Sequence, residues 1–387
     1  MGGQRAASRR ASTRARAGET AVRRQLEERG VRRACDERPG GRRMSGETER
    51  AVSEALARFF PGAAPFVRSG ASGMNNMTRF AELDGRRYVL RIYETHQDVD
   101  KVLYEHAVLL ALNESSTLPF AVPRPERTPD DGDGTVVRLA DGRLAALFGY
   151  IEGERPSLDR PAALRAFGRA AGALSGALAN VRVAAAPAYR PYYELDAAHP
   201  SIAPADAARF FEAPPDAFAD LAGELRVVGR ELADARLALP ALRALPHQLV
   251  HGDLNASNAL AVPGGDDIAA LLDFEFVTVD LRAMEPAVCL SDLSDAESDE
   301  DVLGRMSAFA AGYASAARLS PEEADALPLL LRLRRIDVVL HFLGRWRDRI
   351  EGPEPLRRVA AGSARALERL RRLEAPLRDI FAGLAAE

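Results

Sequence analysis

The segment from His251 to Asn258 constrains the fold of this chain more than any other. It reads His-Gly-Asp, four further residues and then Asn, and Asp273 follows at the end of a later apolar stretch. The residues between Asn258 and Asp273 suit a β-hairpin, with strands over 259–262 and 268–272 joined by a Gly-Gly-Asp-Asp turn. Because the two ends of a hairpin lie side by side, we expect Asn258 and Asp273 to be close in space.

An aspartate, an asparagine and a second aspartate in this arrangement are typical of phosphoryl transfer. One carboxylate orients the acceptor hydroxyl, while an amide oxygen and the second carboxylate hold Mg²⁺ on the nucleotide phosphates. Protein-kinase catalytic loops have the same Asp-to-Asn spacing. The pattern predicts Asp253 as the catalytic base, Asn258 and Asp273 as metal ligands, and ATP as the phosphoryl donor. The alternative is that His251, Asp253 and Asn258 only cap turns.

The amino-terminal half predicts a small antiparallel sheet. An amphipathic helix is expected over 47–60, followed by strands over 65–69, 77–83 and 86–94. The loop between the first two strands is rich in small residues, so its backbone N–H groups could face phosphates, although an ordinary turn is the alternative. The predicted nucleotide contacts in this loop are Gly70, Ser72, Gly73, Asn75 and Asn76.

Arg91 lies on the third expected strand, where a protein kinase carries its phosphate-binding Lys. The next expected helix, over 98–113, carries Glu105, which could pair with it. Arginine binds phosphate through its planar fork, so we predict that both residues serve the nucleotide. The alternatives are a solvated strand face for Arg91 and a surface helix position for Glu105.

Two further strands, over 136–140 and 143–150, would complete a five-stranded sheet, and residues 150–153 would follow as a hinge. A hinge offers backbone N–H and C=O groups to an adenine ring, with apolar side chains above and below it. The predicted residues of this part of the nucleotide site are Phe148, Tyr150, Ile151, Leu260 and Leu272. For Leu260 and Leu272, plain core packing is an equal alternative.

The chain after Pro156 predicts helices. Long Ala- and Leu-rich helices are expected over 157–180 and 217–239. Ser320 begins another, with Pro328 expected to break it early, and a last helix is expected over 354–384. The Pro-rich, aromatic stretch over 187–193 is expected to be an irregular surface connection, with a substrate contact left open.

Taken together, these motifs resemble the family of aminoglycoside phosphotransferases, choline kinases and type II homoserine kinases. In that family Gly replaces the Arg of the protein-kinase motif, as in His251-Gly252-Asp253, and some members carry Arg at the position of Arg91. The resemblance covers most of residues 47–387. It implies an α+β, two-lobed protein-kinase-like fold, with a small antiparallel-sheet amino lobe and a larger, mainly helical carboxy lobe.

The same resemblance implies a domain plan and a function. A nucleotide-binding amino lobe is expected over 44–149, a hinge over 150–153, and a catalytic and acceptor-binding helical lobe over 154–387. The implied reaction transfers a phosphoryl group from ATP, with Mg²⁺, to a hydroxyl of a small molecule. The acceptor could be an aminoglycoside, an amino alcohol or a hydroxy amino acid.

Several polar residues near the catalytic segment are candidates for support and acceptor binding. His251 and Asp280 are predicted to support the site. The predicted acceptor contacts are Asn255, Glu275, Glu285, Asp337 and His341. The many carboxylates favour an amine-bearing acceptor, because an acidic cleft concentrates cations. The alternatives are that Arg282 and Arg345 neutralise them, that Glu285 is structural, and that His341 is a core histidine.

Two other function classes remain open from sequence alone. A kinase acting on protein is disfavoured, because His-Gly-Asp replaces His-Arg-Asp and no Ala-Pro-Glu activation segment follows Asp273. A nucleotide-binding pseudokinase that serves as an interaction module is disfavoured by the intact Asp253, Asn258 and Asp273.

The first 43 residues differ in composition from the rest, with 13 arginines and 5 acidic residues. A disordered extension is the favoured interpretation, and Met44 is a candidate natural start. The acidic residues argue against a targeting peptide, and no aromatic residue accompanies the arginines as in a nucleic-acid arm. Cys35 and Cys289 give no disulfide framework, which favours a reducing cytosol. No apolar run reaches membrane-span length, so no membrane is expected as a partner. Nucleic acid is not expected as a partner either. The oligomeric state stays open.

Overall fold

The computed structural model describes residues 46–70, 76–94, 98–115, 118–129, 132, 134–187 and 189–386. The chain divides into two compact units, residues 1–50 and 51–387. Of the first unit, residues 46–50 are described, and they begin helix α2 (Gly46–Phe59). The predicted extension over 1–43 lies outside the described residues. Both lobes of the fold belong to the second unit.

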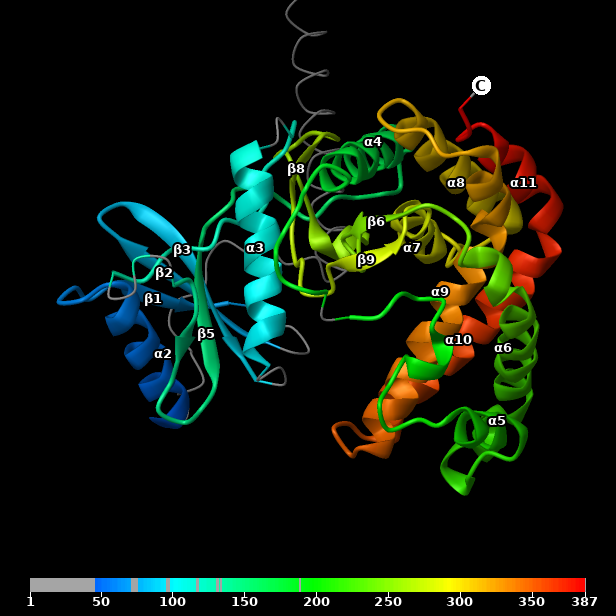
Figure 1. Ribbon diagram of the computed structural model, residues 1–387, viewed down its shortest axis with the longest axis horizontal. Helices are drawn as coiled ribbons and strands as arrows, with labels where there is room; N and C mark the ends of the chain where they lie inside the picture. Colours follow the sequence, from blue (N-terminus) through cyan, green and yellow to red (C-terminus); the bar gives the residue numbers. More distant parts are fainter. Residues whose placement is uncertain are drawn as a thin grey trace, which may run out of the picture. The chain divides into compact units, whose positions relative to one another are not determined.

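The amino lobe contains a five-stranded antiparallel sheet in the spatial order β1-β2-β3-β5-β4, which confirms the prediction (Figure 1). Its strands are β1 (Phe66–Ser69), β2 (Asn76–Leu83), β3 (Arg86–Tyr93), β4 (Val137–Arg138) and β5 (Leu144–Gly149). Asp84 and Gly85, both with positive φ, form the tight turn between β2 and β3. Full pairing of β2 with β3, from Asn76↔Tyr93 to Leu83↔Arg86, places Arg91 in the middle of the sheet.

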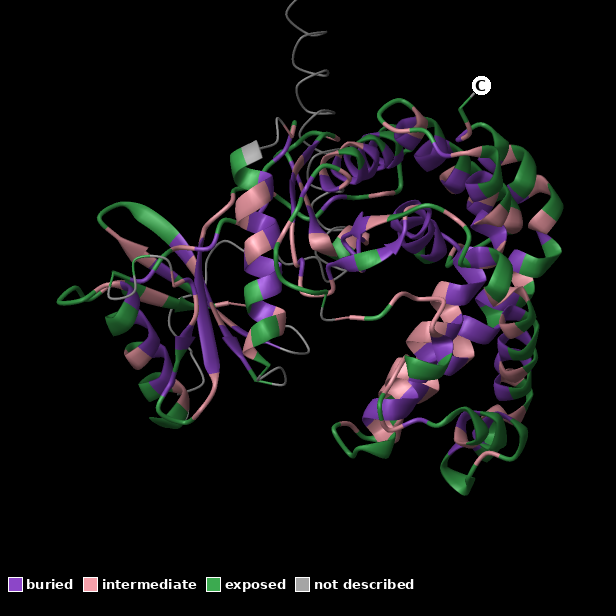
Figure 2. Ribbon diagram, in the orientation of Figure 1, coloured by how far each residue is buried: buried purple, intermediate pink, exposed green. Residues whose placement is uncertain are grey.

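Strand β5 is buried on both faces, as its colour in Figure 2 shows. Successive side chains of a strand point to opposite faces. Ala145 and Leu147 accordingly join the cluster that contains the buried side chains of α2, while Ala146 and Phe148 join the cluster that contains helix α3 (Val99–Ser115). The sheet is therefore packed on both faces, and β3 and β5 form its rigid centre.

The carboxy lobe is mainly helical. Its helices are α4 (Pro161–Leu178), α5 (Pro204–Glu212), α6 (Ala222–Leu242), α7 (Met284–Asp292), α8 (Asp299–Ala314), α9 (Pro321–Arg347), α10 (Pro353–Arg372) and α11 (Glu374–Ala382). Two short antiparallel pairs lie between α6 and α7 in the chain: β6 (His247–Val250) with β9 (Thr278–Leu281), and β7 (Ala259–Ala261) with β8 (Ile268–Leu271). Helix α9 contacts α6, α7, α10 and α11. The α+β, two-lobed arrangement is the one predicted.

Two helix predictions were wrong. Helix α9 runs through Pro328, which is buried, because packing of the surrounding helix outweighs the one hydrogen bond that proline cannot make. Ser320 does cap this helix, with its side chain and that of Glu323 forming a capping box. The single helix expected over 354–384 is two helices, α10 and α11, which meet at Leu373.

Helices α4 and α8 approach so closely that their backbones meet. A Cβ atom at Gly168 would lie 2.1 Å from the carbonyl oxygen of Phe309. In the opposite direction, a Cβ at Gly312 would lie 2.1 Å from the carbonyl oxygen of Arg165. The two glycines thus allow a contact that any side chain would prevent.

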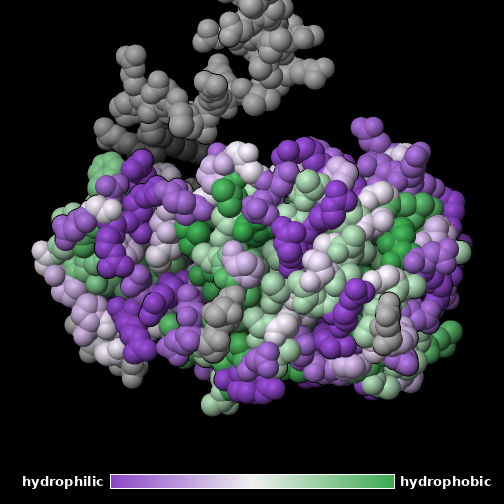
Figure 3. All heavy atoms as spheres, turned by 90° about the horizontal axis from the view of Figure 1, so that it is seen from above, coloured by the Kyte–Doolittle hydropathy of each residue, from purple (hydrophilic) through white to green (hydrophobic). Residues whose placement is uncertain are grey.

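The surface mixes hydrophilic and apolar side chains over the face drawn in Figure 3. Many of the arginines form ion pairs with acidic residues, such as Arg236 with Asp196 at 2.6 Å and Arg372 with Asp299 at 2.9 Å. Among the described residues, no helix combines the length and the apolar character that a membrane crossing needs.

Candidate active site

The catalytic segment leaves β6 through a sharp turn at Gly252, whose φ is +84°. A Cβ atom there would lie 2.3 Å from the carbonyl oxygen of Phe276, so only glycine fits. The turn directs the next residue, Asp253, out of the core, and the side chain of Asp253 is 25% exposed. The glycine of the His-Gly-Asp motif is therefore a steric requirement of this loop.

His251 is fully buried and connects the two catalytic segments. Its Nδ1 accepts a hydrogen bond from the Asp253 backbone N–H at 3.3 Å, so Nε2 carries the proton and donates to the Leu272 carbonyl at 2.9 Å. Burial lowers the pKa of His251 to about 4, which keeps the ring neutral. The imidazole thus ties the Asp253 turn to the residue before Asp273, in keeping with its predicted supporting role.

Glu285 and Asn255, which were predicted to contact the acceptor, form hydrogen bonds with the backbone of the catalytic segment. Glu285 is 1% exposed, and its carboxylate accepts the backbone N–H of His251 at 2.8 Å. Burial raises the pKa of Glu285 to about 7. Asn255 accepts the Ser257 N–H at 2.9 Å and so caps the short 3-10 helix over Ala256–Asn258. Glu285 therefore supports the backbone at His251, and Asn255 supports the backbone at Ser257.

The predicted hairpin is confirmed. Ala259 pairs with Leu271, and the Leu272 N–H donates to the Asn258 carbonyl at 2.8 Å, so Asn258 and Asp273 come to the same end. Asp273 has a φ of +64°, a left-handed conformation that aspartate tolerates better than most residues and that is common at functional sites. Asn258 donates its amide N–H to the Asp253 carbonyl at 2.9 Å. The three predicted catalytic residues are thereby brought together.

Arg91 extends from β3 into this same region. Its Nη1 lies 3.3 Å from the carboxylate of Glu105 on α3, and its Nη2 lies 3.1 Å from that of Asp273. Glu105 is 3% exposed, and burial raises its pKa to about 8 against the opposing effect of Arg91. The predicted pair of Arg91 and Glu105 is present, and Asp273 shares it.

The loop before β2 is described only in part. Ser72, Gly73 and Asn75 lie outside the described residues. Gly70 donates its N–H to the Thr78 carbonyl at 3.3 Å, as in an ordinary turn. Asn76 is buried and donates its side-chain amide to Glu275 at 2.9 Å. Glu275, predicted to bind the acceptor, thus lies on the Arg91 side of the site.

Residues 148–153, which include the predicted hinge, contact both lobes. Phe148 is buried beneath the Arg91 guanidinium, 5.5 Å from it. A Cβ at Gly153 would lie 2.6 Å from the Leu260 Cβ, so the hinge backbone runs directly over β7. Tyr150 packs under Arg87, with 4.3 Å between guanidinium and ring centroid. Ile151, Leu260 and Leu272 are all half-buried, which leaves apolar surface beside the hinge.

The other side of Asp253 contains an arginine that the sequence did not single out. Arg334, on α9, places Nη2 2.5 Å from Oδ1 of Asp253 and Nη1 3.8 Å from the carboxylate of Asp337. Burial raises the pKa of Asp253 and raises that of Asp337 to about 6, while Arg334 opposes both shifts. One arginine is therefore shared by two carboxylates.

Tyr192 also reaches the site, from the aromatic stretch in which a substrate contact was left open. The Tyr192 hydroxyl donates to the Gly252 carbonyl and accepts from Arg334 at 2.7 Å. The Tyr192 N–H donates to Asp280 at 2.7 Å, and burial raises the pKa of Asp280 to about 7. Asp280 is thus in contact with a residue of the site, as predicted for a supporting residue. The spacing of Arg334 and Asp337, which share a helix face, is the signal that could have found Arg334.

His341 lies one turn beyond Asp337 and faces His199, with 6.0 Å between ring centroids. The arginines that were expected to neutralise the site are engaged elsewhere. Arg282 pairs with Glu323, and Arg345 pairs with Glu351 at 2.7 Å. Of Arg282, Arg345 and Arg334, only Arg334 pairs with the carboxylates of Asp253 and Asp337.

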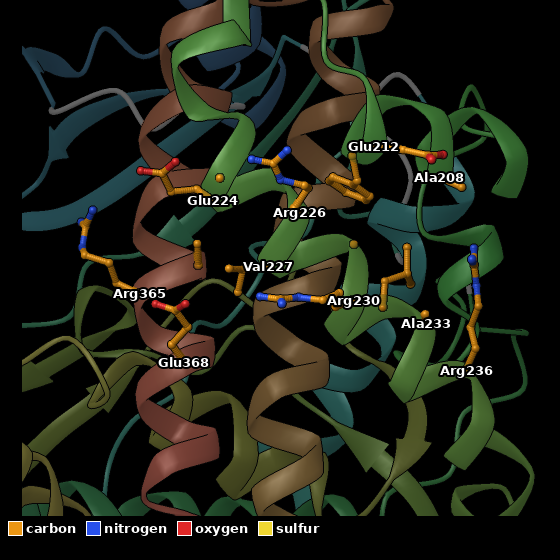
Figure 4. A pocket seen from close by; sticks show the side chains of 15 residues that line it. Ala208, Glu212, Glu224, Arg226, Val227, Arg230, Ala233, Arg236, Arg365 and Glu368 are labelled. Carbon is orange, nitrogen blue, oxygen red and sulfur yellow. The ribbon is translucent and has the colours of Figure 1, made fainter.

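A hollow of about 810 Å³ lies apart from these residues, between α5, α6 and α10. Phe211, Val227 and Leu232 contribute apolar surface to it, and charged side chains of both signs surround it (Figure 4). The charged residues are Glu212, Glu224, Arg226, Arg230, Arg236, Arg365 and Glu368. The hollow shares no residue with the predicted site, so the chemistry described above does not depend on it.

Comparisons with known proteins agree with this geometry. The model of the phosphotransferase enzyme family matches residues 67–319. A homoserine kinase of Sinorhizobium fredii is 26% identical over 305 residues, which cover 77% of this chain and 85% of the relative.

Solved structures with the same fold include a microcompartment-associated aminopropanol kinase, with a TM-score of 0.60 and 19% identity over 86% of this chain and 98% of that one. An amicoumacin kinase in complex with AMP-PNP and Ca²⁺ has a TM-score of 0.59 and 17% identity over 84% of this chain and 96% of that one. These likenesses confirm the two-lobed protein-kinase-like fold.

The family match covers well over half of the chain and includes Arg91 in the amino lobe and the segment from Asp253 to Asp273 in the carboxy lobe. It confirms the prediction of a phosphotransferase with an alcohol group as acceptor. The chain belongs to the phosphotransferase enzyme family, and it is a small-molecule kinase of that family.

Proposed function

We propose that this kinase transfers the γ-phosphoryl group of ATP, with Mg²⁺, to a hydroxyl of an amine-bearing small molecule. The observation that carries the proposal is the meeting of Asp253, Asn258 and Asp273 beside Arg91. Four separate segments contribute to this meeting, namely β3, the His251 turn, the start of β7 and the end of β8. The residue types are those that phosphoryl transfer requires.

The donor set suits Mg²⁺ held jointly by protein and nucleotide. Oδ1 of Asp273 is buried and accepts no hydrogen bond, although Nη2 of Arg91 lies 3.1 Å from it. The Asn258 amide nitrogen is turned to Asp253, which leaves the amide oxygen as a ligand. Within the described part of the chain, no three His, Cys, Asp or Glu side chains cluster as a metal site. Asp273 and Asn258 would therefore hold the ion together with phosphate oxygens. When bound, Mg²⁺ neutralises charge on the transferred group.

The remaining roles follow from position. Arg91, braced by Glu105, would face the phosphates from the sheet, and the hinge over 150–153 would meet the adenine ring. Asp253 would accept the hydrogen bond of the acceptor hydroxyl and orient it for attack. In this proposal residues 51–149 form the nucleotide-binding lobe, and residues 154–387 form the catalytic and acceptor-binding lobe.

The amine on the acceptor is proposed from the charges around Arg334. Asp253 and Asp337 together outnumber the one guanidinium that lies within 4 Å of both. Asp337 is 18% exposed, and its closest cation is Arg334 at 3.8 Å, which Asp253 shares at 2.5 Å. A buried carboxylate with so weak a partner favours a cationic ligand. The homoserine and aminopropanol kinases named above act on alcohols that carry an amine, which supports this acceptor class.

The test is a coupled ADP-release screen of the purified chain with MgATP. The amine-bearing acceptors are L-homoserine, 3-amino-1-propanol, ethanolamine, choline and kanamycin. The neutral alcohols 1-butanol and glycerol serve as matched controls. We expect ADP release above the acceptor-free rate with at least one amine and with neither control, and loss of that release in Asp253→Asn. Release that is equal with amines and neutral alcohols would contradict the proposed acceptor class.

A further inference from the structure

Arg334 approaches the proposed catalytic base from α9. Its Nη2 lies 2.5 Å from Oδ1 of Asp253, and its Nη1 donates to the Tyr192 hydroxyl at 2.7 Å. The guanidinium also lies over the Tyr192 ring, 5.3 Å from the ring centroid. One planar group therefore contacts both the carboxylate and the tyrosine.

Tyr192 extends this contact to the backbone of the catalytic loop. Its hydroxyl donates to the carbonyl of Gly252, the peptide group immediately before Asp253. Its own N–H donates to Asp280, which is fully buried. Tyr192 is therefore fixed at its backbone and at its hydroxyl, although it precedes Gly252 by 60 residues in the chain.

The loop holds the backbone of Asp253 but gives its carboxylate weak support. Gly252 has no side chain to pack, and the hydrogen bond from the Asn258 amide to Oδ2 of Asp253 is long, at 3.3 Å. The carboxylate is a quarter exposed. Its orientation must therefore come largely from contacts outside the loop, and Arg334 and Tyr192 supply these from α9 and from the aromatic stretch.

We infer that Arg334 and Tyr192 are positioning residues that together hold the Asp253 carboxylate, and the peptide group before it, in the orientation that the acceptor hydroxyl requires. The inference rests on the proposed role of Asp253 as the base. Its energetic basis is the sensitivity of catalysis to geometry, since a misplacement of about 1 Å can cost roughly a hundredfold in rate.

The contacts also explain why an arginine is needed. Nη1 and Nη2 of Arg334 reach different partners at once, and Nε is buried between them and the helix. A lysine at this position would keep the charge, but its single ammonium lacks the rigid fork that meets both groups in a fixed geometry. Arg334→Lys therefore separates the effect of charge from the effect of orientation.

The activity test compares Arg334→Met, Arg334→Lys and Tyr192→Phe with the unmodified chain, using L-homoserine and 3-amino-1-propanol as acceptors. We expect kcat to fall about tenfold in Tyr192→Phe and about a hundredfold in Arg334→Met, with Arg334→Lys between them. The KM for ATP should change less than about twofold, because neither residue contacts the Arg91 side. The double variant should be no slower than Arg334→Met alone, because both residues act through one carboxylate.

Each variant has a matched neighbour of the same residue type. The Tyr193 hydroxyl contacts His247 at 3.1 Å, and Arg335 binds the Ser291 carbonyl at 2.5 Å and Asp295 at 2.9 Å. Tyr193→Phe and Arg335→Met should keep the unmodified kcat. Losses in these controls as large as those in Tyr192→Phe and Arg334→Met would overturn the inference.

A second measurement does not depend on turnover. Amide hydrogen exchange over residues 250–258 reports how firmly the loop is held. We expect faster exchange in Tyr192→Phe and Arg334→Met than in the unmodified chain and the two controls. Unchanged protection, or an effect confined to the acceptor KM, would overturn the positioning role. If the unmodified chain releases no ADP with any of the five amine-bearing acceptors of the screen, the proposed acceptor class fails, while the exchange comparison still decides the inference.

Discussion

Two arginines flank the proposed transfer centre, and each is shared by two carboxylates. Arg91 lies 3.3 Å from Glu105 and 3.1 Å from Asp273, while Arg334 lies 2.5 Å from Asp253 and 3.8 Å from Asp337. The two side chains are equally buried, at 17% and 16% exposure. Their partners differ, because Glu105 is 3% exposed, whereas Asp253, Asp273 and Asp337 are 25%, 36% and 18% exposed.

This difference separates a buried structural pair, Arg91 with Glu105, from the partly exposed carboxylates beside Arg334. The pair of Arg91 and Glu105 joins β3 to α3 inside the amino lobe, so breaking it leaves a buried carboxyl group without its partner, which costs about 1–3 kcal/mol. The carboxylates around Arg334 reach solvent, where the acceptor must enter. Changes on the Arg91 side should therefore affect stability and nucleotide use together, and changes on the Arg334 side should affect acceptor chemistry alone.

The largest effect is expected at Asp273, which belongs to the metal site and to the Arg91 group at once. Asp273→Ala should lower kcat by about a thousandfold or more, because the charge on the transferred phosphoryl group is no longer neutralised. Asn258→Ala should be milder, since one carboxylate and the phosphates remain. Asp267→Ala, on the exposed turn of the same hairpin, is the matched control. Normal turnover by a folded Asp273→Ala chain would remove the metal assignment.

A smaller, mixed effect is expected at Arg91. Arg91→Met should lower kcat/KM for ATP by about a hundredfold and should also lower Tm, because Glu105 is left buried and unpaired. Adding Glu105→Gln should recover much of the Tm and none of the kcat/KM. Arg86→Met, at the exposed start of β3, should change neither quantity. Full recovery of ATP use in the double variant would show that Arg91 is only structural.

The dryness of the Arg91 side can be tested with pH. His106 on α3 is 1% exposed, hydrogen-bonds Thr135 at 2.7 Å, and has its pKa lowered to about 3 by burial. The unfolded chain binds a proton near pH 6.5 that the folded chain does not bind, so stability is lost as pH falls from 6.5 toward 3. At pH 5 the expected loss from this residue is about 2 kcal/mol. Denaturant unfolding of His106→Gln should show a weaker dependence over this range, and an unchanged dependence would indicate a solvated imidazole.

The smallest effect is expected at Asp337. Asp337→Asn should raise the KM for an amine-bearing acceptor about tenfold while leaving the KM for ATP unchanged, because one charge-assisted contact is lost. Asp325→Asn, near the start of the same helix, is the control, since Asp325 pairs with Arg378 away from the site. A rise in the KM for ATP would erase the proposed division between the two sides.

The Arg91 side could be predicted from sequence because its residues follow local patterns. Arg91 is in the middle of an alternating strand, Glu105 is on the next helix, and Asn258 and Asp273 bound a hairpin. The hairpin spans a short stretch of chain, so its spacing places Asn258 beside Asp273. The five-stranded sheet was predicted for the same reason. The pairing of Arg91 with Glu105 was predicted from the resemblance to the kinase template.

The Arg334 side could not be predicted in this way. Arg332, Arg334 and Arg335 follow one another closely on α9, and only the packing of that helix decides which one faces Asp253. Nearness in sequence also misled, since Glu275 and Glu285 follow the catalytic loop but turn toward Asn76 and the His251 backbone. Tyr192 lies in a segment without helix or strand periodicity, so no sequence pattern predicts which way its side chain points.

The meeting of α4 and α8 sets a limit on redesign of this enzyme. At Gly168 and Gly312 each helix faces the main chain of the other, so no exchange of a neighbouring side chain can make room for a substituent. Asp337 meets a side chain instead, that of Arg334, and that neighbour can be varied with it. A library aimed at new acceptors should therefore diversify the residues around Arg334 and hold the two glycines constant.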